Sequence, residues 1–277
     1  EIIEILIPPM HVHFLDPYRP HPSPVHALDA RIKLVLVVAF ILACAFTPVG
    51  AWPVYILLFT LILAVVILSE LGVAYVLKRS ALALPFMLAA LPLLFSVQGS
   101  PLWGFSLGKV QLSISQAGLV RFLSITLNSW LSGIAAIVLA SSTPFPNLLA
   151  AMRSLRIPRL LVSIFGLMWR YLFVLVDEVL RLQRARAARS GELGQPGSKP
   201  GGSIAWRARV TGGMAGNLFL RGLERSDRIY LAMVSRGYDG EVRSFAPPPL
   251  RTADWLALWL GVGLLISLLV VGFMMVR

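Results

Sequence analysis

Charge is nearly missing from the middle of this chain, and acidic residues are scarce throughout. Only 13 of the 277 residues are Asp or Glu, against 25 Lys or Arg, so the formal net charge is +12. Between residues 80 and 152, only Lys109 and Arg121 are charged. A chain that is 57% hydrophobic, with a mean hydropathy of +0.78, is too apolar for an ordinary soluble domain. We therefore expect a polytopic membrane protein.

Motifs for nucleotide binding and catalysis are also absent. The sequence contains no GxxxxGK[ST], so it lacks the phosphate-binding loop of many ATPases. It contains no HExxH, no nucleophile elbow and no carboxylate pair inside an apolar segment. Ionisable residues inside a bilayer usually mark ion pathways, and here Glu70 and Arg121 lie near the ends of apolar segments. We expect no catalysis and no cofactor, and a self-contained secondary carrier or channel is the weaker alternative.

Metal-ligating side chains are few. The single cysteine, Cys44, lies in an apolar run, which excludes an internal disulfide and predicts a small buried side chain. All four histidines lie in the proline-rich first 31 residues. His11 and His13 would share one face of an extended chain and are weak candidates for binding a soft divalent metal. Surface histidines in an irregular arm are the alternative interpretation.

The charge that is present is concentrated in one segment. From Arg153 to Arg251 there are 17 Lys and Arg against 7 Asp and Glu, which accounts for +10 of the net charge of +12. Basic segments beside membrane spans remain in the cytoplasm and meet anionic lipid head groups. The basic run from Arg181 to Arg189 has no interleaved aromatic residues, so we expect no nucleic-acid binding.

Five apolar segments predict five membrane spans. Asp29 is expected to cap the first helix, and Arg31 and Lys33 place the start of that helix at the cytoplasmic side. Pro85 and Pro92 predict bends within the third span. With a cytoplasmic N-terminus, five spans leave the C-terminus outside. The predicted spans cover residues 34–46, 54–68, 82–97, 118–139 and 255–276.

Two long helices are predicted at residues 159–190 and 204–237, joined by a flexible linker rich in Gly, Pro and Ser. The centre of the first, 160–176, is apolar enough to graze or enter a membrane, but Trp169, Arg170 and Tyr171 favour an interfacial position. Steps of three and four residues place an apolar stripe on each helix. The stripes are Ile164, Met168, Tyr171, Leu175, Val179 and Leu182, and Val210, Met214, Leu218, Ile229 and Met233.

An arginine extends each stripe. Arg189 follows Leu182 by seven residues and Arg236 follows Ile229 by seven, which is nearly two helical turns. A charge at the end of an apolar face is well placed to enter a pocket on a partner protein. The alternative is an ordinary helix C-terminus, where a basic residue favours the negative end of the helix dipole. The occurrence of the pattern on both helices favours docking.

Several stretches of this sequence carry a family pattern. The strongest is residues 221–240, which includes Ser235, Arg236 and Gly237. The others are residues 26–33, 142–145, 155–158, 170–173 and 184–190. Together they resemble the transmembrane T component of energy-coupling-factor (ECF) transporters, in particular the CbiQ-like branch associated with cobalt or nickel uptake. The resemblance extends from His26 to about Gly240.

The resemblance implies two Ala-Arg-Gly-type motifs at the ends of crossed coupling helices. In the family, each Arg enters a groove on one of two ATP-binding cassette (ABC) ATPase subunits. Here Ser190 stands where the family has Gly and Ser235 where it has Ala, while both arginines are retained. The implied ATPase-coupling residues are Ala188, Arg189, Ser190, Ser235, Arg236 and Gly237.

The expected architecture is all-α, with about five transmembrane helices and a cytoplasmic helical coupling domain containing two long crossed helices. We expect a polar arm containing Pro and His at residues 1–31 and a bundle of four spans at 32–141. The coupling domain should cover 142–250 and the last span 251–277.

The resemblance implies a multi-pass protein of the bacterial inner membrane that acts as a non-catalytic coupling subunit. It would transmit ATP-driven motion of the two ATPases to a separate substrate-binding membrane (S) subunit, CbiM-like. The expected substrate is Co²⁺, with Ni²⁺ or a vitamin as alternatives. The lipid bilayer is the other expected partner.

Overall fold

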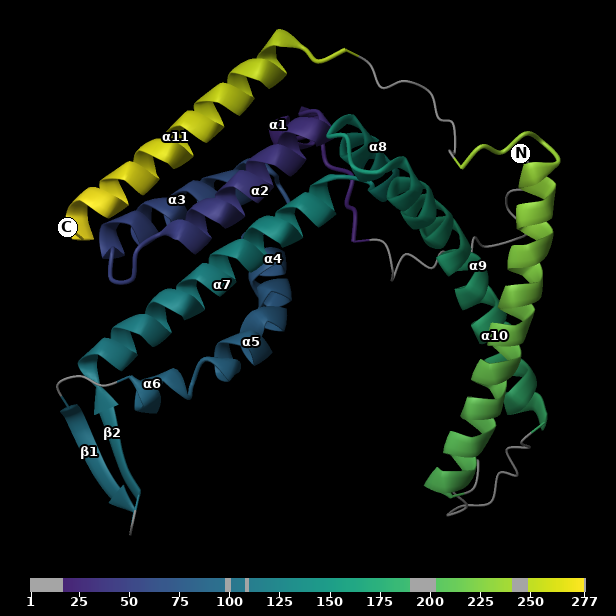
Figure 1. Ribbon diagram of the computed structural model, residues 1–277, viewed down its shortest axis with the longest axis horizontal. Coiled ribbons are helices and arrows are strands. Elements are labelled where there is room, and N and C mark those ends of the chain that lie inside the picture. Colours follow the sequence, from purple (N-terminus) through teal and green to yellow (C-terminus); the bar gives the residue numbers. More distant parts are fainter. Residues whose placement is uncertain (1–16, 98–100, 108–109, 190–202, 241–248, 277) are drawn as a thin grey trace. The chain divides into compact units, whose positions relative to one another are not determined.

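The computed structural model describes residues 17–97, 101–107, 110–189, 203–240 and 249–276. The chain divides into two compact units. One comprises residues 17–155 and 247–277, and we call it the membrane unit. The other contains residues 156–246 together with residues 1–16, and we call it the crossed-helix unit. The predominantly helical fold predicted from the sequence is confirmed (Figure 1).

The membrane unit consists mainly of apolar helices, and four of the five predicted spans are helical. Asp29 caps α2 as predicted, because its carboxylate accepts the backbone N–H of Arg31 at 2.8 Å. The four helices that correspond to predicted spans are α2 (Ala30–Phe46), α3 (Trp52–Leu68), α7 (Gln116–Ser142) and α11 (Thr252–Val276). Two shorter helices, α1 (Pro24–Ala27) and α8 (Phe145–Ser154), lie at one end of this bundle, where α2 begins and α7 ends.

The third predicted span, residues 82–97, for which Pro85 and Pro92 predicted bends, is broken into separate short helices. Prolines lack the backbone N–H that would continue a helical ladder, and the chain turns just before and at Pro92. The segment forms a series of short pieces that pack against α7. These pieces are a 3₁₀ turn (Ala81–Ala83), α5 (Leu84–Ala89) and α6 (Leu93–Ser96), and they follow the short helix α4 (Val73–Ser80).

A β-hairpin precedes α7, in a segment for which the sequence predicted only an external connection. Strand β1 (Pro101–Leu107) pairs antiparallel with β2 (Val110–Ser115), and Phe105 lies opposite Leu112. Within the described residues, these strands are the one departure from an all-helical chain.

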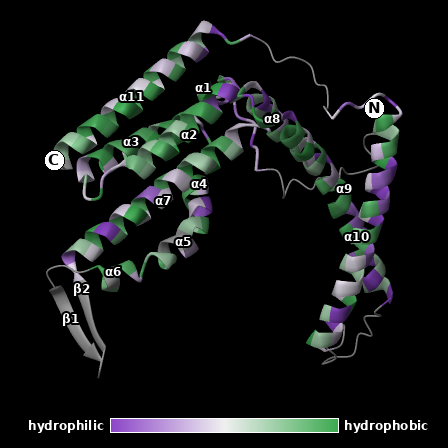
Figure 2. Ribbon diagram, viewed as in Figure 1, coloured by the Kyte–Doolittle hydropathy of each residue, from purple (hydrophilic) through white to green (hydrophobic). Residues whose placement is uncertain are grey.

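The core of the membrane unit lies where α2, α3, α7 and α11 meet. Cys44 and Leu131 are fully buried and Leu58 nearly so, which confirms the prediction of a small buried side chain at Cys44. The outer faces remain apolar, as the green ribbons of Figure 2 show. On α11, for example, Trp259 and Met274 are 68% and 75% exposed. An apolar surface of this kind suits lipid.

Three helices of the described chain are long and apolar enough to cross a membrane: α7, α9 (Arg159–Arg189) and α11. Helix α3 is apolar but shorter. Helix α9 belongs to the crossed-helix unit. Its length and composition permit it to cross a membrane, whereas the sequence favoured an interfacial position for it. Together with its apolar surface, these helices make the chain a membrane protein.

Gly118 allows the first turn of α7 to lie close to α6 and to Ser115, the residue that precedes α7. A Cβ at this position would lie 3.0 Å from the carbonyl oxygens of Leu93 and Leu94, and 2.9 Å from Ser115 Oγ. Ser115 Oγ caps α7 by accepting the Gly118 N–H at 2.9 Å, and it donates to the Val97 carbonyl at 2.6 Å. The backbone carbonyls cannot move aside without displacing α6.

We expect Gly118→Ala to lower the free energy of unfolding by about 1–3 kcal/mol, because the added methyl group overpacks this junction. Gly133→Ala is the matched control in the same helix, since its Cβ would meet only Ala83 Cβ at 3.8 Å. The control should be neutral, or stabilising by up to ~1 kcal/mol through helix propensity. Unfolding in one detergent provides the comparison. Equal stability of the two variants would contradict the proposed role of Gly118.

Candidate functional site

The two long helices of the crossed-helix unit pack against each other as an antiparallel pair. Helix α9 reaches Arg189, the last described residue before the linker, and α10 (Ile204–Val234) begins with Ser203 Oγ accepting the Trp206 N–H. Glycines within α10 do not interrupt it. The prediction of two long helices that cross is confirmed (Figure 1).

An ion pair joins the middle of the two helices. Arg221 Nη1 on α10 donates to Glu178 Oε1 on α9 at 2.8 Å, and the other oxygen of Glu178 lies 3.5 Å from Arg181 Nη1. Towards the end of α9, Arg186 Nη1 donates to Thr211 Oγ1 at 3.3 Å. A later residue of α9 thus pairs with an earlier residue of α10, which defines the antiparallel direction.

The predicted stripes meet at this contact. A cleft of about 540 Å³ between the helices is lined by Leu182 and Arg189 of α9 and by Val210 and Met214 of α10. The guanidinium of Arg186 lies 5.8 Å from the centre of the Trp206 ring, within reach of a cation–π interaction. The sequence pattern therefore correctly identified the facing sides of this part of the pair, and Arg189 continues the α9 stripe into the cleft.

The end of α10 differs in detail from the prediction. The regular helix stops at Val234, and residues 235–237 form the turn that closes it. The N–H of Gly237 donates to the Val234 carbonyl at 2.9 Å, and that of Tyr238 to the Met233 carbonyl at 3.0 Å. These are the paired bonds of a Schellman motif, and Gly237 has the required left-handed φ of +79°.

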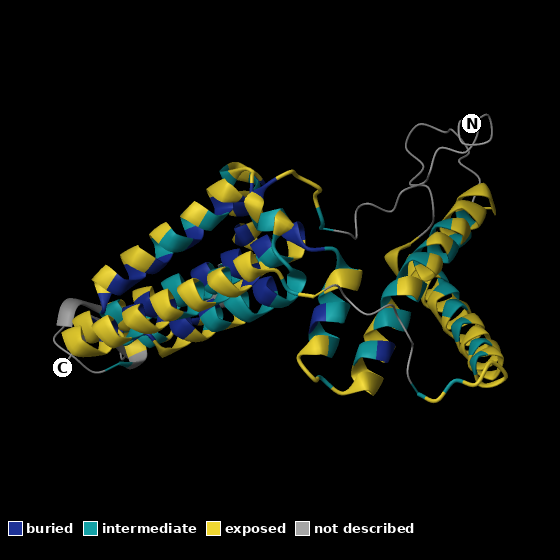
Figure 3. Ribbon diagram, turned by 90° about the horizontal axis from the view of Figure 1, so that it is seen from above, coloured by how far each residue is buried: buried dark blue, intermediate teal, exposed yellow. Residues whose placement is uncertain are grey.

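Both motif arginines are exposed to solvent, like most residues of the crossed-helix unit, whose ribbon is largely yellow in Figure 3. Because the helices run antiparallel, their C-terminal ends, and with them Arg189 and Arg236, lie at opposite ends of the pair. Ala188 and Ser235 are exposed beside these arginines, and Ser235 Oγ donates to the Ala232 carbonyl at 3.0 Å. Ser190 lies outside the described residues.

A second apolar face of α10 was missed by the sequence analysis. Phe219, Leu223, Tyr230 and Val234 are 65%, 49%, 57% and 47% exposed. Their steps of four, seven and four residues place them on one side of the helix, so the same periodicity argument could have found them. The cross-helix pair Glu178–Arg221 carried no comparable signal, because nothing in the sequence joins two residues so far apart.

The histidines of the described region have structural contacts. His26 Nδ1 lies 2.6 Å from Ser23 Oγ, and Nε2 lies 3.0 Å from the Arg19 carbonyl. Burial lowers the pKa of His26, which favours the neutral ring that can donate from Nε2 and accept at Nδ1. The candidate metal ligands His11 and His13 lie outside the described residues. Within the part that the structure describes, no group of three or more His, Cys, Asp or Glu is placed to hold a metal ion.

Apolar helices long enough to cross a bilayer, together with a basic pair of long helices, define a polytopic membrane protein. The sequence of residues 21–245 matches the family CbiQ, described as a cobalt transport protein. The chain therefore belongs to the CbiQ family and is a subunit of a membrane transporter.

Individual relatives span two branches of this family. The cobalt transport protein CbiQ of Salmonella typhimurium is 30% identical over 58% of this chain and 70% of its own length. The energy-coupling factor transporter transmembrane protein EcfT of Staphylococcus aureus is 28% identical over 82% of this chain and 84% of its own. A putative fused cobalt transport protein CbiMQ of Methanocorpusculum labreanum is 27% identical over 79% of this chain, which covers 35% of that longer protein.

Reversing one charge of the Glu178–Arg221 pair should loosen the helix crossing, and reversing both should restore it. The readout is the rate of disulfide formation between Leu182→Cys and Met214→Cys, in a protein whose native Cys44 is replaced by Ala. Glu178→Arg or Arg221→Glu alone places like charges together, at a cost of about 0.2–1 kcal/mol, and should slow the cross-link.

The double reversal should recover the original cross-linking rate. Arg184→Glu is the control, because Arg184 bonds only to the Leu180 carbonyl of its own helix among the contacts seen for it. If the double reversal cross-links as slowly as the single variants, the ion pair does not set the crossing.

Gly237→Ala should open the end of α10. An L-residue in the left-handed region costs about 1–2 kcal/mol, which corresponds to roughly 5–30-fold in a local equilibrium. Hydrogen exchange at the Tyr238 amide should accelerate by that factor. Gly222→Ala is the control within the same helix, since its added Cβ meets nothing within 4 Å. Unchanged exchange in Gly237→Ala would show that this turn does not depend on glycine.

Proposed function

We propose that this chain is the non-catalytic coupling subunit of an ECF-type ABC importer. Two ABC ATPase subunits bind the ends of the crossed helices, one through Arg189 and the other through Arg236. Motion of the ATPases during the ATP cycle tilts α9 and α10, and this movement is passed to a substrate-binding membrane subunit. The flanking residues Ala188, Ser190, Ser235 and Gly237 complete the two docking motifs.

The observation that carries this proposal is the antiparallel crossing. It sets two exposed arginines at opposite ends of one helix pair, an arrangement suited to engaging two separate subunits. A guanidinium supplies donors in a fixed fork and fits acidic or carbonyl-lined grooves. The exposed apolar face of α10 gives additional area that a protein partner would cover.

The names of the relatives support a membrane partner. One is named an ECF transporter transmembrane protein and another a fusion of CbiM with CbiQ. We infer that a CbiM-like S subunit binds the apolar surface of this chain, within the bacterial inner membrane. In this arrangement residues 32–141 and 251–277 lie in the bilayer, and residues 142–250 form a cytoplasmic coupling domain.

We propose Co²⁺ as the transported substrate, on the basis of the CbiQ family description. Substrate choice lies with the S subunit, so Ni²⁺ or a vitamin would leave the role of this chain unchanged. Co-purification from native membranes in a mild detergent, followed by mass spectrometry, identifies the S subunit. Recovery of the chain without ATPases in several mild detergents would favour a self-contained carrier instead.

Replacing both motif arginines should uncouple the complex. A charge-assisted contact contributes about 1.5–3 kcal/mol, so Arg189→Ala or Arg236→Ala alone should weaken ATPase binding by about tenfold or more. The double variant should lose both ATPase co-purification and ATP-driven uptake. Arg184→Ala with Arg225→Ala removes two charges from exposed positions outside the two motifs, and serves as the matched control. Normal uptake by a well-expressed Arg189→Ala, Arg236→Ala protein would refute the docking role.

A further inference from the structure

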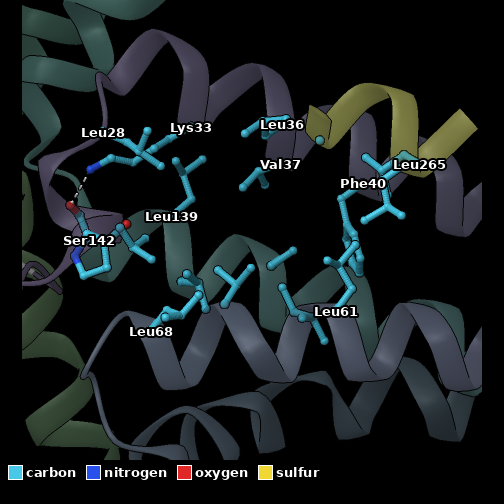
Figure 4. Close-up of a pocket in the computed structure, with 18 residues that line it drawn as sticks. Leu28, Lys33, Leu36, Val37, Phe40, Leu61, Leu68, Leu139, Ser142 and Leu265 are labelled. Atoms are coloured by element: carbon cyan, nitrogen blue, oxygen red, sulfur yellow. Dashed lines mark hydrogen bonds between the residues drawn. The ribbon is translucent and has the colours of Figure 1, made fainter. Parts of the chain in front are cut away.

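A deep apolar cleft runs between the helices of the membrane unit. Its volume is about 370 Å³, and α2, α3, α7 and α11 form its walls (Figure 4). Phe40 and Leu265 are each 5% exposed within it, whereas Leu68 and Leu264 are 55% and 45% exposed. The cleft therefore has a buried interior and a rim that opens to the surroundings of the bundle.

Lys33 lies at one end of this cleft. Its Nζ donates to the carbonyls of His26 at 3.2 Å and Ser142 at 3.1 Å, as the dashed line to Ser142 in Figure 4 indicates. Ser142 is the last residue of α7, so the ammonium also caps the negative end of that helix. An ammonium has three N–H groups, and these carbonyls accept two of them.

Lys33 is 7% exposed, and its ammonium is bonded to neutral carbonyls, so the charge of this buried cation is not compensated by a direct contact with an anion. Asp29 is the nearby carboxylate, but it accepts the Arg31 backbone N–H and lies 3.5 Å from Arg31 Nε. Asp254 Oδ1 and Oδ2 accept the backbone N–H groups of Asp29 and Arg251. Within the described residues, no ion pair of Lys33 with either carboxylate is seen. The walls of the cleft are thus apolar, and one end of it carries the positive charge of Lys33.

We propose that this cleft binds an acyl chain of an anionic phospholipid, with the lipid phosphate at Lys33. Lys33 and Phe40 are seven residues apart on α2, or about 10 Å along the helix, which suits the upper part of an acyl chain. Each buried CH₂ favours binding, and basic pockets between helices on the cytoplasmic side of a membrane bind anionic head groups. The site is independent of the coupling role.

The dimensions favour a lipid chain over a partner helix. A helix with side chains is about 10–12 Å across, so it could insert at most a side chain into a cleft of 370 Å³. Such a side chain would bring no negative charge to Lys33 unless it were Asp or Glu, which is rare in apolar spans. An acyl chain with a phosphate matches both the apolar walls and the charged end.

Photo-crosslinking of the full chain in nanodiscs tests the proposal. The probes are phosphatidylglycerol and phosphatidylcholine that carry the same diazirine-labelled acyl chain, and mass spectrometry maps the labelled residues. Phosphatidylglycerol should label the cleft around Phe40, Leu61 and Leu265 about tenfold more strongly than phosphatidylcholine, because the choline cation of phosphatidylcholine offsets the charge of its phosphate and weakens the attraction to Lys33.

Three variants at the site separate charge from shape. Lys33→Gln should abolish the preference for phosphatidylglycerol, Lys33→Arg should retain it, and Lys78→Gln is the control at an exposed lysine. Leu139→Trp fills the cleft from α7 without changing its charge, and should remove labelling by both lipids. The Leu139→Trp variant decides the question if Lys33→Gln does not yield folded protein.

Two results would overturn the proposal. One is equal labelling by the two lipids, spread over outward-facing residues such as Trp259 and Met274. The other is unlabelled cleft residues in nanodiscs together with cross-links from the cleft to a protein subunit in the purified complex. The second result would assign the cleft to a partner side chain.

Discussion

A bilayer tolerates neither unpaired backbone groups nor isolated charge, and this constraint governs how the chain is built. The four helices of the bundle satisfy their backbone groups internally and meet lipid with apolar side chains. Lys33 is the informative exception. Its long side chain is buried near the start of α2, and two backbone carbonyls, where α1 and α7 end, accept two of its three ammonium N–H groups. The same contacts that make the residue tolerable also tie three helices together.

The crossed-helix unit follows a different rule, because it can place charges on its surface. Glu178 is positioned between Arg181 of its own helix and Arg221 of the other, so one carboxylate faces two guanidiniums near the crossing. Exposed ion pairs contribute little stability individually, and the crossing also rests on the apolar contact of the stripes. The Glu178–Arg221 pair therefore fixes the direction and register of the two helices more than it adds to their stability. A helix pair fixed at its centre can transmit a displacement of one end to the other, which is what a coupling role requires.

Local sequence signals predicted much of this fold and little of its long-range detail. Asp29 acts as the cap that its position predicts, and Leu182 and Arg189 share a face as their spacing requires. Pro85 and Pro92 signalled bends, but periodicity alone could not show that the segment would divide into separate short helices. Gly212, Gly213 and Gly216 are weak helix formers, yet α10 runs through all three without a break. Helix propensity is a weak preference that neighbouring contacts override.

The site shows the same division. The two candidate arginines were predicted from spacing along single helices, whereas the Glu178–Arg221 pair depends on how two helices meet. Lys33 was read from the sequence as a marker of the cytoplasmic side. Its burial and its contact with Ser142 depend on packing between segments far apart in the chain. Sequence patterns identify which face of a helix is used, but they do not identify what it meets.

Helix α9 combines two requirements that limit where it can lie. Its first part is apolar enough to span a bilayer, while Glu178 and the arginines after it belong to the water-exposed crossing. If residues 159–176 crossed the membrane, Arg170 would lie near the middle of the apolar stretch, at a cost of about 2.5–3.5 kcal/mol or more. At the interface, Arg170 and its neighbours Trp169 and Tyr171 would meet head groups, where aromatic and basic side chains are favoured. The physical argument therefore supports an interfacial α9, with its apolar face available to lipid or to a membrane partner and its basic end in water.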